Sequence, residues 1–202
     1  MSEARGDANV LRMLRTGTAA EHEAVERALD LLDPDLDRDR LVEVLSLLHG
    51  FWLAAEAGLD AWAAAFPGDA DVVDWSRRCR APLFAADLAA LGAAAPADQP
   101  ELPPLPGTEE ALGRLYVLEG ATMGGTFIDR HLAALPGLAG VRLRAFSPYG
   151  SETGAMWHAF RRVTRDRVAD GGDAAAVVAS ARDTFRVLAE WCAPVGARAT
   201  GR

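Results

Sequence analysis

His22 is the residue in this sequence best placed to bind a metal, because it interrupts an apolar helical stripe. Steps of three or four residues separate Leu14, Thr18, His22, Val25 and Leu29, which puts them on one face of a helix. A histidine ring that faces a core needs a polar partner, because burying it alone costs free energy. That partner is either a metal such as a haem iron, bound through one ring nitrogen, or a nearby backbone carbonyl. The histidines that compete for this role are His49, His131 and His158.

Three glycines lie inside a segment whose apolar pattern otherwise predicts a helix, LYVLEGATMGGTFIDRHL at 115–132. Each glycine costs a helix about 1 kcal/mol relative to alanine, so Gly120, Gly124 and Gly125 together must meet a structural demand. Gly120 and Gly124 stand four residues apart and therefore share one face. Either another helix packs closely against that face, or a flat ligand lies against the exposed backbone.

The densest positive patch of the chain falls in GAMWHAFRRVTRDRV at 154–168. Helical spacing puts His158, Arg162 and Arg165 on one face, while Arg161 and Arg165 share an adjacent face. Arginine suits carboxylates because its planar fork binds both oxygens. The patch is therefore either a site for an anionic ligand or a solvated face whose charge is neutralised by nearby acids.

Aromatic side chains gather in the second half of the chain. We expect most of them to lie in the core and some to line an apolar pocket. These residues are Phe127, Phe146, Tyr149, Trp157, Phe160, Phe185 and Trp191.

The elements that would position these residues are helices throughout. Apolar periodicity predicts helices over about 10–32, 38–66, 70–92, 108–135, 151–168 and 173–192, and strand signals are almost absent. Asp37 is a candidate N-cap for the second helix, and we expect Pro82 to break or kink the third. Loops rich in alanine, proline or glycine are expected at 93–107 and 136–150. The sequence thus predicts an all-α protein of six or seven helices.

Composition excludes several classes of protein. The 202 residues carry a net charge of −8, which argues against a nucleic-acid binder and against a surface drawn to anionic lipid. No uninterrupted apolar run reaches the roughly 18 residues of a membrane span, and the N-terminus lacks an apolar signal core. Cys79 and Cys192 cannot build a disulfide scaffold or a zinc knuckle. We therefore expect one cytoplasmic domain over 1–202, with its core at about 10–192 and short flexible tails.

Several catalytic motifs are missing from the sequence. No Glu-x-x-His pair marks a di-iron bundle, no GK[ST] follows the glycines, and no serine nucleophile elbow occurs. No G-x-G-x-x-G fingerprint marks a flavin or nicotinamide site. Redox chemistry would therefore need electrons from a partner protein.

Three segments, in this order, resemble the biliverdin-producing heme oxygenase family, and most closely its bacterial members that accompany bacteriophytochromes. LRTGTAAEHEAVE at 14–26 is similar to the proximal helix of that family, and LGRLYVLEGATMGG at 112–125 to its distal helix. AFSPYGSETGAMWHAFRRV at 145–163 resembles the region with a YG…G..W..F pattern. The resemblance covers roughly 11–192.

The resemblance implies a single-domain heme-oxygenase-like bundle with a glycine-kinked distal helix, and a role for each matching residue. His22 would be the proximal ligand of the haem iron, with Glu26 as a polar neighbour. Gly120 and Gly124 would bring the distal backbone over the haem, and Thr122 supplies the nearest hydroxyl on that stretch. The residues implied to bind the rest of the haem are Arg15, His158 and Arg162 at the propionates and Phe185 in the pocket lining.

The reaction and its partners are also implied by the resemblance. Haem would be both cofactor and substrate, and O2 would convert it to biliverdin, carbon monoxide and ferrous iron. Electrons would come from a ferredoxin or a flavoprotein reductase, and an acidic ferredoxin could dock on the arginines of 161–167. A bacteriophytochrome is the candidate acceptor of biliverdin.

One position departs from the family pattern. Many heme oxygenases carry an aspartate just after the first distal glycine, and this chain has Ala121 there, with Met123 where a small polar residue is common. Proton delivery would therefore be built differently or be weak. This departure keeps two alternatives open: a haem carrier of the same fold without turnover, and a member of the fold that acts on another small molecule.

Overall fold

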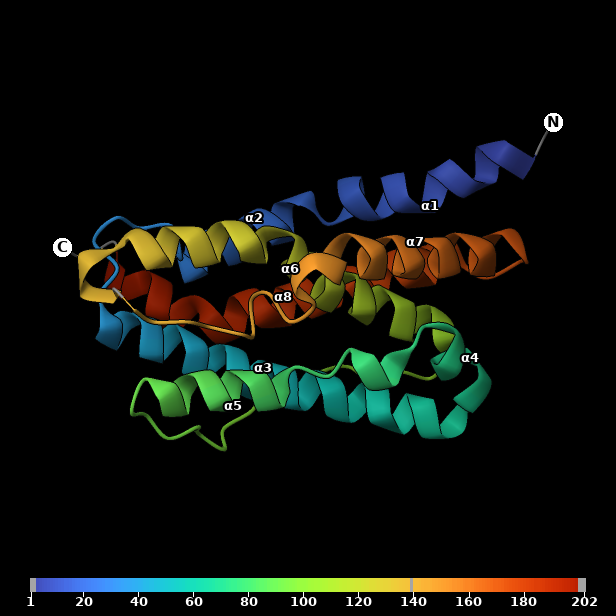
Figure 1. Ribbon diagram of the computed structural model, residues 1–202. Coiled ribbons are helices and arrows are strands. Elements are labelled where there is room, and N and C mark those ends of the chain that lie inside the picture. Colours follow the sequence, from blue (N-terminus) through green and yellow to red (C-terminus); the bar gives the residue numbers. More distant parts are fainter. Residues whose placement is uncertain (1–2, 139, 200–202) are drawn as a thin grey trace.

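Helices make up the architecture of the computed structural model, which describes residues 3–138 and 140–199 (Figure 1). Within these residues there is no β-strand. The α-helices are α1 (Glu3–Gly17), α2 (Ala19–Leu29), α3 (Arg38–Ala65), α4 (Pro67–Val72), α5 (Ala81–Ala90), α6 (Thr108–Ala134), α7 (Thr153–Ala169) and α8 (Ala174–Ala199). The 3-10 helices are η1 (Trp75–Arg77), η2 (Pro136–Leu138) and η3 (Gly150–Glu152). The all-α prediction is confirmed.

Helix α8 is the centre of the bundle. Helices α6 and α2 pack along it most extensively, and α1 and α3 also contact it. Helix α5 lies against α3, and α7 lies beside α1 (Figure 1). The fully buried core includes Leu14, Leu45, Phe51, Trp62 and Phe160. Helix α8 therefore supports both α2, which carries His22, and α6, which carries the three central glycines.

The helix predicted over 10–32 is in fact two helices that meet at Thr18. The Thr18 backbone has φ −116° and ψ 5°, and its hydroxyl donates to Leu14 O at 2.7 Å. Backbone bonds from Thr18 N to Leu14 O and from His22 N to Thr18 O continue across the junction. The polar side chain thus stabilises a local distortion that the apolar spacing alone does not reveal. His22 stands on a short helix of its own, one turn after this junction.

Helix α3 begins as the sequence predicts. Asp37 has an extended backbone, and its carboxylate accepts a hydrogen bond from Arg40 N at 2.8 Å, which is N-cap geometry. An 18-residue window of α3 has a mean hydropathy of 1.3, so by length and composition this helix could cross a membrane. However, 56% of that window is buried inside the structure. A buried core helix passes the same test, so this helix is weak support for a membrane span.

The helix predicted over 70–92 is also divided. Helix α4 ends at Val72 and α5 begins only at Ala81, with η1 between them. Pro82 stands in the first turn of α5, where its missing N–H breaks no hydrogen bond, so it starts a helix and does not kink one. Asp74, with φ 57°, takes the left-handed conformation that turns the chain between the two helices.

Helix α6 is assigned as one helix through Gly120, Gly124 and Gly125, so the implied kink stays a prediction. At the two ends of the chain regular structure extends further than the predicted core of 10–192. Helix α1 begins at Glu3 and α8 ends at Ala199, while 1–2 and 200–202 lie outside the described residues.

Candidate functional site

Helices α2 and α6 both lie on α8 and are tied to each other at two levels. At one level the Thr18 hydroxyl lies near the Tyr116 hydroxyl, whose pKa it acts to lower. At the other level His131 Nε2 lies 3.2 Å from Asp33 O, in the turn after α2. Fifteen residues separate the two ties along each segment, 18 to 33 and 116 to 131. The segments therefore run in the same direction, and His22 on α2 is level with Gly120 on α6, each one turn beyond the first tie.

The His22 ring is exposed, and the expectation that it faces the core is wrong. Its side chain is 56% exposed, and its ring makes a T-shaped contact with Phe185 of α8 at a centroid distance of 5.5 Å. Nδ1 lies 3.6 Å from Glu26 Oε2, one turn further along α2. Glu26 thus stands where it can orient the ring, which leaves Nε2 as the nitrogen able to coordinate a metal.

The Gly120 and Gly124 face of α6 is bare backbone. A Cβ built on either glycine would meet no atom within 4 Å, outside its own helix backbone and chain neighbours. Gly125, on another face of the same helix, is different, because a Cβ there would overlap Phe146 O. Close packing therefore explains Gly125, whereas no packing contact explains Gly120 and Gly124. The interpretation that a flat ligand lies against bare backbone survives for these two.

This arrangement fits haem better than a bare metal ion. Among the described residues no group of three His, Cys, Asp or Glu side chains could hold an ion. A single accessible imidazole suits an iron whose other in-plane ligands come from a porphyrin. An apolar disc would also gain from the Phe185 ring and from glycines that allow close approach to the backbone.

The end of this site near Tyr116 is cationic. Burial raises the pKa of Tyr116, while the Thr18 hydroxyl and the charges of Arg15 and Arg161 act to lower it. Arg15 stands on α1 three residues before Thr18, and Arg161 stands on α7 one turn after Trp157, whose ring centroid lies 5.8 Å from that of Tyr116. They would offer two guanidinium groups to carboxylates at this end.

Arg161 is a residue that the sequence analysis did not assign to the site. Helix α7 packs Trp157 against Tyr116 at a ring-centroid distance of 5.8 Å, and Arg161 follows Trp157 by one turn on the same face. The predicted residues His158 and Arg162 lie one position further around α7 and are exposed. The four-residue step from Trp157 was the signal that could have selected Arg161.

Thr122 lies away from the bare face of α6. It is buried, and its hydroxyl donates to Glu119 O at 2.7 Å. The Glu119 carboxylate, also buried, is paired with Arg78 and accepts a hydrogen bond from Tyr149 at 2.7 Å. Ala121 is exposed and brings no polar group. The polar groups of this stretch are therefore engaged on the packed side of the helix.

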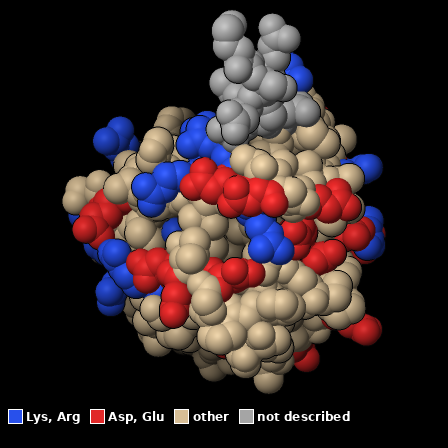
Figure 2. All heavy atoms as spheres, turned by 90° about the vertical axis from the view of Figure 1, so that its right-hand side faces the viewer, with Lys and Arg blue, Asp and Glu red and all other residues tan. Residues whose placement is uncertain are grey.

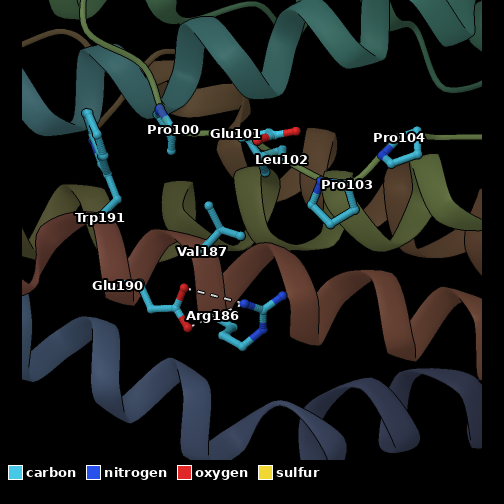
Figure 3. Close-up of a pocket in the computed structure, with 9 residues that line it drawn as sticks. All are labelled: Pro100, Glu101, Leu102, Pro103, Pro104, Arg186, Val187, Glu190 and Trp191. Atoms are coloured by element: carbon cyan, nitrogen blue, oxygen red, sulfur yellow. Dashed lines mark hydrogen bonds and ion pairs between the residues drawn. The ribbon is translucent and has the colours of Figure 1, made fainter.

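One hollow of the described structure lies elsewhere. It has a volume of about 550 Å³ and runs between the proline-rich segment 100–104 and α8 (Figure 3). Arg186, the cation in it, is engaged by Glu190 at 3.4 Å and by Asp183 at 3.2 Å. This groove brings no free catalytic or ligating group together. The candidate site therefore remains the exposed faces of α2 at His22 and of α6 at Gly120 and Gly124, here called the gap between α2 and α6.

Comparison with known proteins gives one informative relative. A protein named heme oxygenase from Xanthomonas campestris pv. campestris (strain 8004) is 32% identical over 151 residues, covering 74% of this chain and 87% of the relative. No protein-family model matches the chain, and no solved structure matches it.

Proposed function

Because the chain belongs to the heme oxygenase family, we propose that it opens the haem macrocycle to biliverdin, carbon monoxide and ferrous iron. The observation that carries this proposal is the pairing of an exposed imidazole, His22, with a bare backbone face at Gly120 and Gly124 on the neighbouring helix. Haem is the substrate as well as the cofactor. O2 and electrons from a redox partner complete the reaction.

The residues of α2 would hold the haem from one side. His22 Nε2 would bind the iron, and Glu26 beside Nδ1 would fix the orientation of the ring. When bound, haem supplies the redox chemistry, while the protein supplies position and environment. Phe185 would keep the imidazole edge in an apolar contact and limit the access of water on that side.

On the other side, Gly120 and Gly124 would admit the macrocycle close to the α6 backbone because they carry no Cβ. Arg15 and Arg161 would receive the propionates near Tyr116, with His158 and Arg162 on the adjoining surface of α7. The methyl side chain of Ala121 cannot donate a proton, and the Thr122 hydroxyl donates its hydrogen bond to Glu119 O. We propose that solvent, rather than a side chain at 121, delivers protons here.

The electron donor would dock on the exposed part of α7. Arg167 is engaged with Glu109 at 2.9 Å and lies 3.8 Å from Asp69, so it is not available to a partner. The end of the molecule that carries α4 shows arginines and acids interleaved, with no field of one sign (Figure 2). Because Arg161 is assigned to the propionates, an acidic ferredoxin or a flavoprotein reductase would use Arg162 and Arg165.

The biological setting is part of the same proposal. We propose a single cytoplasmic domain of the bacteriophytochrome-associated type, which supplies biliverdin as chromophore to that receptor. One second function has a specific observation in its favour. Because Ala121 is exposed and Thr122 is engaged, a haem carrier that binds without turnover is the alternative.

One spectroscopic experiment separates these functions. The purified protein is titrated with hemin, then reduced in air with catalase present, and the visible spectrum is followed. We expect a sharp Soret band that decays into the broad red absorption of biliverdin. His22→Ala is expected to lose the band, and added imidazole to restore it by replacing the missing ligand. A band that survives reduction and O2 would indicate a carrier, and no band in the wild type would refute the haem assignment.

A further inference from the structure

Large apolar side chains are exposed at five positions of the described structure, and three of them gather at one end of the gap between α2 and α6. Met123 and Phe127, 49% and 64% exposed, lie one turn apart on α6. Leu32, 47% exposed, precedes Asp33, the residue whose carbonyl contacts His131. Because Phe127 stands one turn before His131, this tie brings Leu32 to the same end.

The three residues adjoin the bare face of α6. Met123 and Phe127 lie one and three positions from Gly124, and Phe127 lies two turns from Gly120 around nearly the same helical angle. Exposed apolar side chains that cluster beside a ligand face mark a surface that becomes covered. The other two exposed large side chains, Phe66 and Val72, lie at either end of α4, away from this gap.

The gap therefore has two chemically different ends. The end at Thr18 and Tyr116 holds the charges of Arg15 and Arg161, and the opposite end is apolar. From Tyr116 to Phe127 the helix rises about 17 Å, a span comparable to a tetrapyrrole with its side chains. Haem has the same asymmetry, with two propionates on one edge and vinyl and methyl groups on the other.

We propose that Leu32, Met123 and Phe127 form an apolar rim that receives the vinyl-bearing edge of haem and sets the orientation of the disc in its plane. This inference rests on the proposed function. The in-plane orientation decides which bridging carbon of the macrocycle comes under the crowding by Gly120 and Gly124. The rim is thus a determinant of which biliverdin isomer is formed, and it acts without touching the iron.

The test compares hemin binding by Phe127→Ser with that of Val72→Ser, a matched control that removes an exposed apolar side chain at α4. Loss of a buried phenylalanine contact corresponds to about 10- to 100-fold in affinity. We expect Phe127→Ser to bind hemin at least about 10-fold more weakly, as followed by the Soret band. We expect Val72→Ser to bind as the wild type does, and both variants to fold because the side chains are exposed.

A second ligand identifies the edge that the rim contacts. Deuterohemin carries hydrogen in place of both vinyl groups, so the loss caused by Phe127→Ser should shrink to less than about threefold with it. Equal losses with hemin and deuterohemin, or no loss with hemin, would overturn the rim. If the wild type and Val72→Ser bind neither ligand, the proposed function fails instead, which is a distinct result.

The product gives an independent readout. Chromatographic separation of the biliverdin isomers should show a mixed or shifted isomer ratio for Phe127→Ser and Met123→Ser, at whatever rate turnover occurs. Val72→Ser should keep the wild-type ratio. An unchanged ratio in both rim variants would show that other contacts fix the in-plane orientation.

Discussion

The two sides of α6 are built in opposite ways. On one side Gly120 and Gly124 meet nothing, while on the other Gly125 lies against Phe146 O and Glu119 is held by Arg78 and Tyr149. Glycine thus occurs in two settings within six residues: open backbone on the bare face, and close contact with the loop behind. The packed side holds the helix so that the bare side keeps its place.

Among the substitutions that test this contrast, Arg78→Ala should cause the largest loss of stability. It leaves the Glu119 carboxylate buried without its cation, and removal of one partner of a buried pair costs about 3–5 kcal/mol. Urea unfolding followed by circular dichroism measures the loss. The double variant Arg78→Met with Glu119→Leu should recover much of the stability, because neither charge is then buried. A loss below about 1 kcal/mol in the single variant would show that the pair does not hold α6.

Gly125→Ala adds a single methyl group on the packed side of α6. Its Cβ would overlap Phe146 O, so either the loop or the helix must move, at a cost of about 2–3 kcal/mol. Thermal unfolding of the protein without haem measures this. Wild-type stability in this variant would mean that the loop yields freely and does not support the helix.

Gly120→Ala is the matched change on the bare side, with the opposite sign for stability. Since nothing crowds this Cβ, the helix should gain about 1 kcal/mol in the protein without haem. Hemin affinity should fall at the same time, because the methyl group occupies the face that haem approaches. Thermal unfolding and Soret titration measure the two effects. Unchanged hemin affinity would place haem elsewhere.

Asp129→Asn should have the smallest effect on stability, and it tests the packed side of α6 through the pH dependence of that stability. Burial raises the pKa of Asp129 on the packed side of α6, and the nearby Asp87 charge adds to the shift. The unionised form is therefore favoured in the folded state. The contribution of Asp129 to wild-type stability is fully present below its unfolded-state pKa, and it is lost as pH rises through its folded-state pKa.

The gain from Asp129→Asn should consequently be larger at pH 7 than at pH 4, and less than about 1 kcal/mol because solvent screens a half-exposed group. Thermal midpoints across that pH range provide the measurement. An equal difference at both pH values would show that the carboxyl group does not titrate differently in the folded state.

The sequence predicts the helices well and the facing of individual side chains less well. Periodicity found His22 and the glycines because spacing is a local property of the chain. It misjudged the exposure of His22, because spacing shows which residues share a helix face but not whether another element packs against that face. Spacing also could not tell which of two adjoining faces of α7 meets the site. The contact of Trp157 with Tyr116 selects the face that carries Arg161.

The cluster of buried polar side chains on the packed side of α6 could not be predicted from spacing. Arg78, Glu119 and Tyr149 come from three distant segments, and the fold alone brings them together. Arginines that read as surface charge in a sequence can be wholly buried, as Arg80 is, with its guanidinium over the Trp52 ring at 4.7 Å.

The arrangement of α2 and α6 couples ligand supply to the lifetime of the fold. The two helices share α8 as support and are tied to each other at the two levels described. A ligand seated between them joins the first and third quarters of the chain, and it can do so only in the native state. Each tenfold rise in free ligand above its dissociation constant then adds about 1.4 kcal/mol to the free energy of unfolding. The amount of this protein that survives proteolysis in a cell would accordingly follow the supply of haem.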